Sequence, residues 1–225
     1  MISGFWEGSA FILPFMFTII MHEIAHGYTA MKLGDKTAYL MGRLTLNPIA
    51  HIDPFGSIIF PFILIMAHAP FLFGWAKPVP VNFAALNNPK KDMGIVALAG
   101  PLMNMLIALG FAVLLKLALK FLPHTQVTDW IILNFQNGVM ISLVLAAFNL
   151  FPVLPLDGGR ILMSILPNKW SFKYAQSEKY GFVILITLLI FLPMFGNLLN
   201  LNLDVIHIYI RWMMDGMLRM LSFVL

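Results

Sequence analysis

Five consecutive residues, HEIAH at positions 22–26, carry the side chains best suited to chemistry in this chain. On a helix, residues four positions apart share one face, so His22 and His26 can present two imidazole nitrogens to one zinc ion. Glu23 then lies beside the metal, where it can take a proton from a water that the metal activates. Hydrolases that attack amide bonds use the same spacing. The motif therefore predicts a zinc site with Glu23 as its catalytic base.

The motif lies within a hydrophobic stretch, residues 9–30, that is long enough to cross a membrane. Ionisable side chains cost about 2.5–3.5 kcal/mol each at the centre of a bilayer, so they are rare there unless they serve a function. The alternative is a chance match whose histidines only satisfy internal hydrogen bonds. That alternative is weaker here than on a soluble helix, because lipid offers few other polar partners.

A third ligand is needed, because catalytic zinc is usually held by three protein side chains with one position left open. Asp157 is the best candidate, since it lies in NLFPVLPLDGGR, positions 149–160, which closes a later hydrophobic stretch. The prolines of this motif interrupt a regular helix and can bend the chain inward. Gly158 and Gly159 permit close backbone approach. We predict that His22, His26 and Asp157 bind one zinc ion.

Two other assignments stay open for the acidic and histidine side chains. Asp157 could simply cap the short helix that LDGGR would begin, which is a frequent role of aspartate. His51 and Asp53, in HIDP, are chemically suitable rival ligands. We expect His51 and Asp53 to organise a loop instead.

The composition is that of a polytopic membrane protein. Hydrophobic residues make up 60% of the chain and charged residues 11%, against about a quarter charged in soluble domains. Cysteine is absent, which excludes disulfides, thiolate ligands and cysteine nucleophiles. The net charge of +4 requires no nucleic-acid partner, because lysine and arginine at span ends are ordinary topology signals. We expect one integral membrane domain over residues 1–225.

The predicted fold is all-α, a bundle of about 4–6 transmembrane helices of roughly twenty residues each. The clearest spans are residues 9–30, 93–117, 130–150 and 180–195. The stretches 55–73 and 203–223 are less clear. The second of these carries a polar stripe, which predicts either an amphipathic interfacial helix or a span packed with the stripe inward. The stripe consists of Asp204, His207, Arg211, Asp215 and Arg219.

Between the first two core spans we predict a re-entrant hairpin over residues 55–82. The positive-inside rule places the amino terminus outside, because lysines and arginines follow the first span and none precedes it. A full crossing by residues 55–73 would put Lys77, Lys90 and Lys91 outside, which the same rule disfavours. A short helix that returns as the extended GWAKPVPVN, positions 74–82, avoids this. The two histidines then lie toward the cytoplasmic half of the membrane.

Three motifs together resemble the site-2 protease family of intramembrane zinc metalloproteases. They are HEIAH in the first span, GPLMN at positions 100–104 and NLFPVLPLDGG at positions 149–159, in that order. The segments GRLTLNPIAHIDPFG, GWAKPVPVN and ALAGP resemble the small bacterial and archaeal branch without a PDZ domain. The likeness covers about residues 15–160. One departure is Leu154, where many relatives carry proline, and it concerns backbone shape rather than the zinc ligands.

The resemblance implies roles for individual residues. His22, His26 and Asp157 are the implied zinc ligands, and Glu23 is the implied base. Asn104 and Asn149 are similar to family asparagines that are thought to contact the substrate backbone or stabilise the reacting carbonyl. Each asparagine could instead satisfy the backbone of a neighbouring helix.

The predicted function is a zinc endopeptidase that hydrolyses peptide bonds within or near transmembrane segments, close to the cytoplasmic face of a prokaryotic cell membrane. A helix hides its amides in internal hydrogen bonds, so the substrate must unwind locally. An extended stretch of this chain could hold the unwound segment by strand addition, although its prolines could also simply end pairing. That stretch is Pro78, Val79, Pro80 and Val81.

The expected partners are transmembrane protein substrates and the lipid bilayer, with no nucleic acid, together with an accessory membrane regulator or a second copy of the chain. The main competing hypothesis is a membrane metal transporter or metal-binding protein that uses the same His and Asp side chains. Transport favours further ionisable residues along a pathway and leaves Glu23 unexplained. An inactive chaperone-like relative is disfavoured, because every expected catalytic residue is present.

Overall fold

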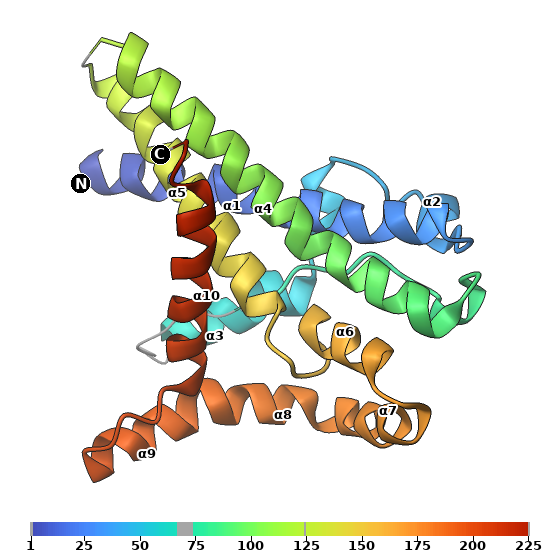
Figure 1. Ribbon diagram of the computed structural model, residues 1–225. Coiled ribbons are helices and arrows are strands. Elements are labelled where there is room, and N and C mark those ends of the chain that lie inside the picture. Colours follow the sequence, from blue (N-terminus) through green and yellow to red (C-terminus); the bar gives the residue numbers. More distant parts are fainter. Residues whose placement is uncertain (1, 67–73, 124, 225) are drawn as a thin grey trace.

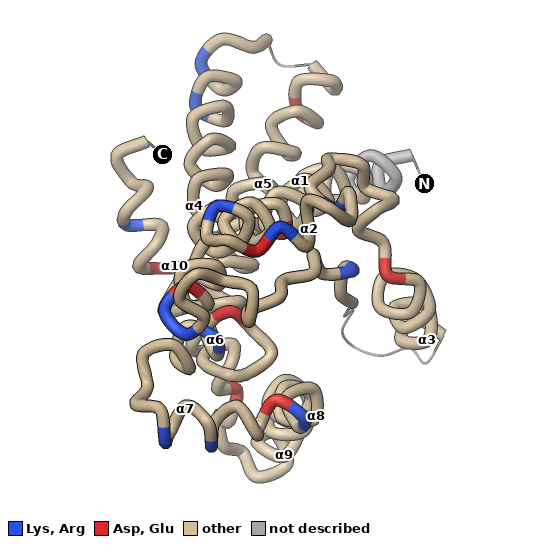
Figure 2. Tube along the Cα trace, turned by 90° about the vertical axis from the view of Figure 1, so that its right-hand side faces the viewer, with Lys and Arg blue, Asp and Glu red and all other residues tan. Residues whose placement is uncertain are grey.

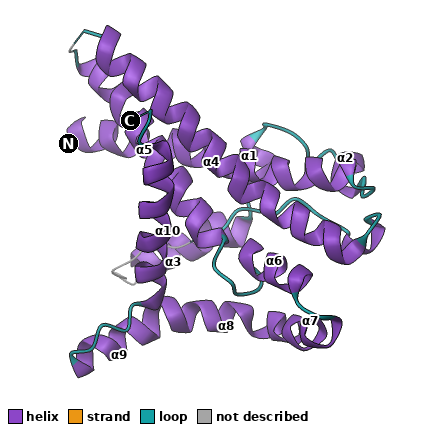
Figure 3. Ribbon diagram, in the orientation of Figure 1, coloured by secondary structure: helices purple, strands orange, loops and turns teal. Residues whose placement is uncertain are grey.

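The protein is helical throughout the part of the chain that the structure describes. The computed structural model describes residues 2–66, 74–123 and 125–224. Within those ranges every regular element is a helix, and Figure 3 shows no strand there. Four of the described helical runs are long and apolar enough to cross a membrane: residues 8–32, 89–121, 126–149 and 168–199. The all-α fold class predicted from composition is confirmed.

Three long helices form the centre of the molecule: α1 (Ile2–Lys32), α4 (Pro89–Phe121) and α5 (Gln126–Asn149). Each of them packs against the other two, and Figure 1 shows α4 and α5 running side by side. Ala108, on α4, and Ala146, on α5, are fully buried in the core that these helices share. Such small side chains let helix backbones approach closely in a membrane.

Local sequence explains where α4 and α5 begin. Pro89 lies in the first turn of α4, where its missing N–H costs little. The Asp92 carboxylate accepts a hydrogen bond of 2.7 Å from the N–H of Asn88, just before the helix. Thr125 and Thr128 form a capping box at the start of α5. These caps fix the register at which both helices enter the bundle.

Hydrogen bonds between α1 and α5 fix the rotation of α1. Thr18 Oγ1 and Ser142 Oγ lie 3.0 Å apart, and both side chains are fully buried. Nearer the amino end, Trp130 Nε1 donates to Ser9 Oγ at 3.0 Å. In lipid these polar groups need partners inside the protein. His22 lies one turn beyond Thr18 on the same face of α1, so the same rotation directs His22 into the bundle.

The connection from α1 to α4 begins with short helices. They are α2 (Thr37–Leu40), η1 (Pro48–His51), and a continuous run made of η2 (Pro54–Ile59) and α3 (Phe60–Met66). At 1.5 Å per residue, the run over residues 54–66 is about 20 Å long, too short for a bilayer core of about 30 Å. The predicted tip of the hairpin, residues 67–73, lies outside the described residues.

Residues 74–82 return to the beginning of that short run. The N–H of Trp75 donates to the carbonyl of Gly56 at 3.1 Å, and the N–H of Lys77 donates to the carbonyl of His51 at 2.9 Å. The returning stretch contains no helix before η3 (Phe83–Ala85). The chain thus turns back on itself as the predicted hairpin requires, while its entry into a membrane stays a prediction.

After α5 the chain bends and continues as a series of helices. The predicted span 180–195 falls inside a longer helical run, residues 168–199. Figure 1 shows α8 and α9 along the lower edge of the molecule, with α10 rising beside α5. The elements are α6 (Asp157–Ile165), α7 (Asn168–Ala175), η4 (Gln176–Tyr180), α8 (Gly181–Ile186), η5 (Thr187–Phe191), α9 (Leu192–Leu199) and α10 (Val205–Leu221).

The C-terminal helix α10 buries an apolar face and exposes its polar stripe. Met217 and Leu221 join the core formed by α4 and α5. His207, Arg211, Asp215 and Arg219 are all exposed, and Asp204 caps the helix by accepting from the N–H of His207 at 3.2 Å. The stripe therefore faces away from the bundle, as an interfacial helix requires, rather than inward.

Charged side chains are concentrated outside the long apolar segments. Figure 2 shows them mainly near helix ends and in the connections between helices. On α4 no charged residue lies between Asp92 and Lys116, and on α5 none follows Asp129. The charge pattern agrees with a multi-pass membrane protein, which keeps ionisable groups away from lipid unless they serve a site.

Candidate metal centre

Three side chains from two distant parts of the chain converge on one point. His22 Nε2 and His26 Nε2, from adjacent turns of α1, lie 3.0 Å apart. Asp157 Oδ2 lies 3.2 Å from His22 Nε2 and 3.3 Å from His26 Nε2. Among the described residues, these three are the only such group of His, Cys, Asp and Glu side chains close enough to hold a metal ion. The helical spacing of HEIAH places the two histidines together, and the bend before α6 brings Asp157 to them.

The bend before α6 is compact because two glycines follow Asp157. A Cβ atom on Gly158 would overlap the Leu150 carbonyl, and one on Gly159 would lie 2.6 Å from the Leu154 nitrogen. Only a residue without a side chain fits so close to main-chain atoms. Leu156 is the N-cap residue of α6, so the Asp157 side chain is not spent on capping. It is free to point toward the two histidines.

Tyrosine hydroxyl groups from later helices also hold the bend. Tyr174 Oη, on α7, donates to the Pro152 carbonyl at 3.0 Å, and Tyr209 Oη, on α10, donates to the Leu150 carbonyl at 3.0 Å. The Tyr209 ring also packs edge-on against Phe151, with ring centroids 5.0 Å apart. The position of Asp157 therefore depends on elements up to α10.

The orientation of His26 follows from a hydrogen bond to the α4 backbone. His26 Nδ1 lies 2.7 Å from the carbonyl oxygen of Val96. Because a carbonyl can only accept, Nδ1 must carry the proton, which leaves Nε2 with a free lone pair. Metal-binding histidines typically use this arrangement to fix ring and tautomer.

Gly100 provides the space on α4 that both imidazole rings occupy. A Cβ atom on Gly100 would overlap His26 Nε2 and would lie 2.5 Å from His22 Cε1. Gly100 belongs to the GPLMN motif, one of the three motifs that carry the resemblance found in the sequence. The close contact here is with the histidine rings on α1.

The donor set fits a zinc ion. Tetrahedral zinc with ligands at about 2.0–2.1 Å places its ligand atoms about 3.3–3.4 Å apart, near the separations of 3.0–3.3 Å seen here. A carboxylate and two imidazole nitrogens form a suitable ligand set for zinc.

Glu23 lies beside this group and is held by main chain from another element. Glu23 Oε2 accepts a hydrogen bond from the N–H of Val79 at 2.6 Å. Its other oxygen, Oε1, has no hydrogen-bond partner within the described residues. Val79 belongs to the returning stretch that the sequence predicted to bind substrate. The sequence does not predict this contact, because a backbone N–H has no sequence signature.

The two predicted asparagines differ in their surroundings. Asn104 is fully buried, and neither Oδ1 nor Nδ2 has a partner among the described residues. It lies one turn beyond Gly100 on α4, so both residues share the face that meets α1. Asn149 Nδ2 donates to the Leu145 carbonyl, four residues earlier on α5, at 3.0 Å.

His51 and Asp53, the rival ligands, make local contacts away from the metal-binding group. His51 Nε2 lies 2.9 Å from the Thr45 carbonyl oxygen, and Asp53 Oδ1 accepts from the N–H of Gly56 at 2.6 Å. Asp53 thereby caps η2. Both residues organise the loop, as expected from the sequence.

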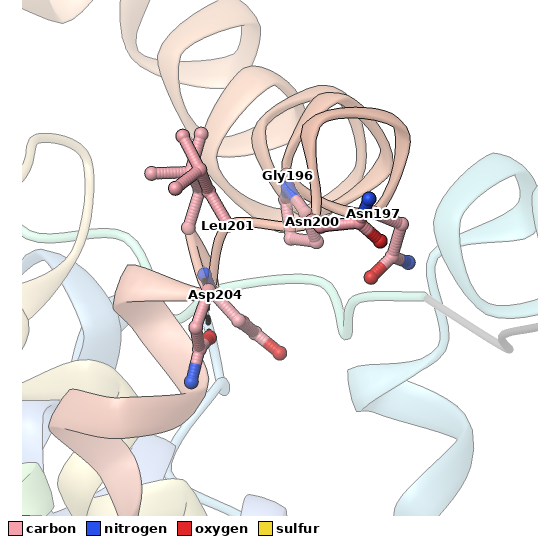
Figure 4. A pocket seen from close by; sticks show the side chains of 8 residues that line it. Gly196, Asn197, Asn200, Leu201 and Asp204 are labelled. Atoms are coloured by element: carbon pink, nitrogen blue, oxygen red, sulfur yellow. Dashed lines mark hydrogen bonds between the residues drawn. The ribbon is translucent and has the colours of Figure 1, made fainter.

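A separate pocket of about 350 Å³ lies at the turn between α9 and α10. Figure 4 shows Gly196, Asn197, Asn200, Leu201 and Asp204 around it. None of the three metal-ligating candidates lines this pocket, and its polar groups belong to a helix end and a helix cap. We assign no chemistry to it.

Comparisons with known proteins bear on the identity of this chain. The sequence profile described as Peptidase family M50 matches residues 122–192. YwhC of Bacillus subtilis is 38% identical to this chain over 181 residues, which is 80% of this chain and 79% of YwhC. YwhC is named provisionally as a zinc metalloprotease. No solved structure matches the chain significantly.

More distant relatives carry similar names. Rip2 of Mycolicibacterium smegmatis, also named provisionally as a zinc metalloprotease, is 27% identical over 80% of this chain and 66% of its own length. MJ0392 of Methanocaldococcus jannaschii, named as a zinc metalloprotease, is 28% identical over 91% of this chain and 47% of its own length.

Proposed function

The chain belongs to peptidase family M50 and is a multi-pass membrane zinc metalloprotease, and we propose that it cuts its substrates inside the membrane, near the cytoplasmic face. One observation carries the proposal. The potential ligand atoms of His22 and His26, on a helix long and apolar enough to span a bilayer, meet that of Asp157 from the start of α6. Such ionisable groups are too costly at that depth to persist without a function.

We assign the zinc ligands to His22 Nε2, His26 Nε2 and one carboxylate oxygen of Asp157, which together hold one ion. A bound zinc ion would supply a Lewis acid that activates water and polarises the scissile carbonyl. Val96 orients His26 through its carbonyl, and Gly100 leaves room for both rings. These contacts hold the ligands in place before any substrate arrives.

Glu23 acts as the general base in this proposal. Its Oε1 is available to take a proton from the attacking water, while Oε2 stays on the Val79 N–H. After attack, the same carboxyl can deliver that proton to the leaving amine, as microscopic reversibility of acid–base catalysis allows.

Asn104 is the stronger candidate for stabilising the charge that develops on the carbonyl oxygen. Its amide is buried and unpaired among the described residues, which is costly unless a ligand uses it. Its Nδ2 can donate to the developing oxyanion. Asn149 already donates one of its two amide N–H groups to the Leu145 carbonyl, so its amide is partly satisfied within its own helix.

The substrate backbone binds along residues 78–81 in this proposal. Pro78 and Pro80 have no N–H, the N–H of Val79 is engaged by Glu23, and the Pro78 carbonyl accepts from Arg43 at 3.3 Å. The groups left for a substrate among the described residues are the Val81 N–H and the carbonyls of residues 79–81. A partial strand pairing of this kind suits an unwound transmembrane segment, since it needs only a short extended stretch. The further partners in this proposal are an accessory membrane regulator or a second copy of the chain.

The cytoplasmic position of the site rests on charge. On the proposed topology Lys77 and Lys90 lie inside the cell, with most other lysines and arginines. Cysteines introduced at Lys77 and Lys90 should resist a membrane-impermeant thiol reagent added outside intact cells. Labelling from outside would refute both the hairpin and the cytoplasmic site.

The competing transport function has less support. A transport path needs further ligating or ionisable groups, and only one metal-ligating group occurs among the described residues. The proposal is tested by incubating the purified protein with a model transmembrane substrate, with Glu23→Gln and a zinc chelator as controls. Cleavage by the wild type alone is expected, and unimpaired cleavage by Glu23→Gln would overturn the proposal.

A further inference from the structure

The contact between Glu23 and Val79 joins the proposed base to the proposed substrate-binding stretch. It is a short hydrogen bond of 2.6 Å between a side chain on α1 and a main-chain N–H 56 positions later. A hydrogen bond to one oxygen restrains the rotation of the carboxylate about the Cγ–Cδ bond of Glu23. The main chain of residues 77–82 thereby decides where the free oxygen of Glu23 points.

The stretch that provides this N–H is anchored on both sides of Val79. On one side, the Lys77 N–H bonds to the His51 carbonyl at 2.9 Å, and Arg43 Nη2 donates to the Lys77 carbonyl at 3.0 Å. On the other side, the Asn82 N–H donates to Asp35 Oδ2 at 2.6 Å. The Val79 N–H is therefore held in place independently of Glu23.

Gly27 allows the stretch to lie so close to α1. It follows Glu23 by four residues and so occupies the next turn on the same face. A Cβ atom on Gly27 would lie 2.7 Å from Val79 Cγ1 and 2.5 Å from Leu44 Cδ2. Leu44 contributes the flexible end of its side chain, whereas Val79 is stiff, β-branched and buried. Alanine at Gly27 would therefore displace Val79 and its N–H.

We propose that Val79 is a positioning residue whose main-chain N–H aims the Glu23 carboxylate, and that Gly27 is the glycine that makes this contact feasible. The inference rests on the proposed function, in which Glu23 is the base. Because the substrate is held by the same stretch, a shift of residues 78–81 disturbs both the orientation of the base and the position of the bound peptide. Substrate binding and base alignment are thus coupled through one segment of backbone.

Alanine variants give the first test. Gly27→Ala is expected to lower kcat about 10- to 100-fold and to raise KM as well, because residues 78–81 also hold the substrate, while zinc content stays at the wild-type level. Gly8→Ala is the matched control, because Gly8 lies on the same helix with no atom within 4 Å of a Cβ. Adding Val79→Ala to Gly27→Ala removes the clashing methyl groups and should restore part of kcat. A Gly27→Ala enzyme with the kcat of Gly8→Ala, or a double variant without any recovery, would overturn the inference.

An amide-to-ester exchange removes the N–H itself and does not depend on how Gly27→Ala folds. Cell-free synthesis with α-hydroxyvaline at position 79 replaces the N–H by an oxygen and keeps the side chain. The expected result is a kcat at least about tenfold below that of a matched ester at Ala76, made with lactic acid, because Ala76 lies outside residues 78–81 and its N–H makes no hydrogen bond among the described residues. If the two esters have equal kcat and Glu23→Gln is inactive, the coupling between Val79 and Glu23 is refuted while the proposed function stands. Full cleavage by Glu23→Gln would instead refute the proposed function.

Discussion

Replacing Gly100 by alanine should disable the metal centre with the smallest change of side chain available. The added Cβ would overlap His26 Nε2 and approach His22 Cε1 to 2.5 Å, whereas ordinary contact begins at 3.4 Å. Neither ring can retreat easily, because His26 is tied to the Val96 carbonyl and His22 is 7% exposed within the bundle. The rings or the helices must therefore move apart by about 0.9 Å to reach ordinary contact.

A shift of that size exceeds what a zinc site tolerates. Ligand distances must stay within about 0.2 Å of their ideal values, so two of the three proposed ligands would be misplaced. Changes in the supporting shell of a metal ligand typically cost 10- to 100-fold in affinity. Because Gly100→Ala acts on two ligands at once, we expect a loss of at least about 100-fold in zinc affinity.

The assay is a competition titration of purified protein with a zinc chelator, with the helical content followed by circular dichroism. Gly110→Ala is the matched control, since Gly110 is exposed on the same helix and no atom lies within 4 Å of its Cβ. It should bind zinc like the wild type and lose no stability, because alanine favours a helix over glycine. Wild-type zinc affinity in Gly100→Ala would refute the reasoning.

Three further predictions concern the framework around the site. Thr18→Val leaves the fully buried Ser142 hydroxyl unpaired and should lower the free energy of unfolding in detergent by about 0.5–1.5 kcal/mol. In a Ser142→Ala background, Thr18→Val should destabilise the protein less. An equal loss of unfolding free energy in both backgrounds would contradict this. Tyr209→Phe removes the hydrogen bond to Leu150 and should slow cleavage by about fivefold, which corresponds to about 1 kcal/mol. An unchanged cleavage rate would show that α10 does not position the bend that carries Asp157. Burial alone would raise the pKa of Asp35, but hydrogen bonds from Thr37 and Asn82 outweigh it and hold that pKa below its ordinary value of 3.8. Asp35 thus stabilises the fold above that value and loses this contribution as the pH falls through its folded pKa, so thermal unfolding should show the advantage of wild type over Asp35→Asn shrinking in acid.

The sequence predicts those features that depend on local spacing. The positions of His22 and His26 on one helical face follow from a separation of four residues, and the predicted core spans follow from the length of apolar runs. Asp157 could be singled out because prolines and glycines around it signal a bend at the end of a span. The assignment of these three side chains as zinc ligands stays a prediction that the observed convergence supports.

Contacts between distant backbone segments could not be predicted in this way. The Val96 carbonyl and the Val79 N–H are chemically identical to those of every other valine, so nothing in the sequence marks them. The pairing of Thr18 with Ser142 depends on the rotation of two apolar helices, and a nearly uniform hydrophobic sequence does not specify it. The contact of Tyr209 with Leu150 is not predictable either, because the sequence marks the last helix only by its charged stripe.

The metal content of single-site variants tests the central claim most directly. Wild type and Glu23→Gln should each contain one zinc ion per chain by elemental analysis, with Glu23→Gln unable to cleave a model transmembrane substrate. Variants with alanine at His22, His26 or Asp157 should contain none after exposure to a chelator that leaves the wild type loaded. A fully loaded Asp157→Ala protein would show that the third ligand lies elsewhere and would contradict the account.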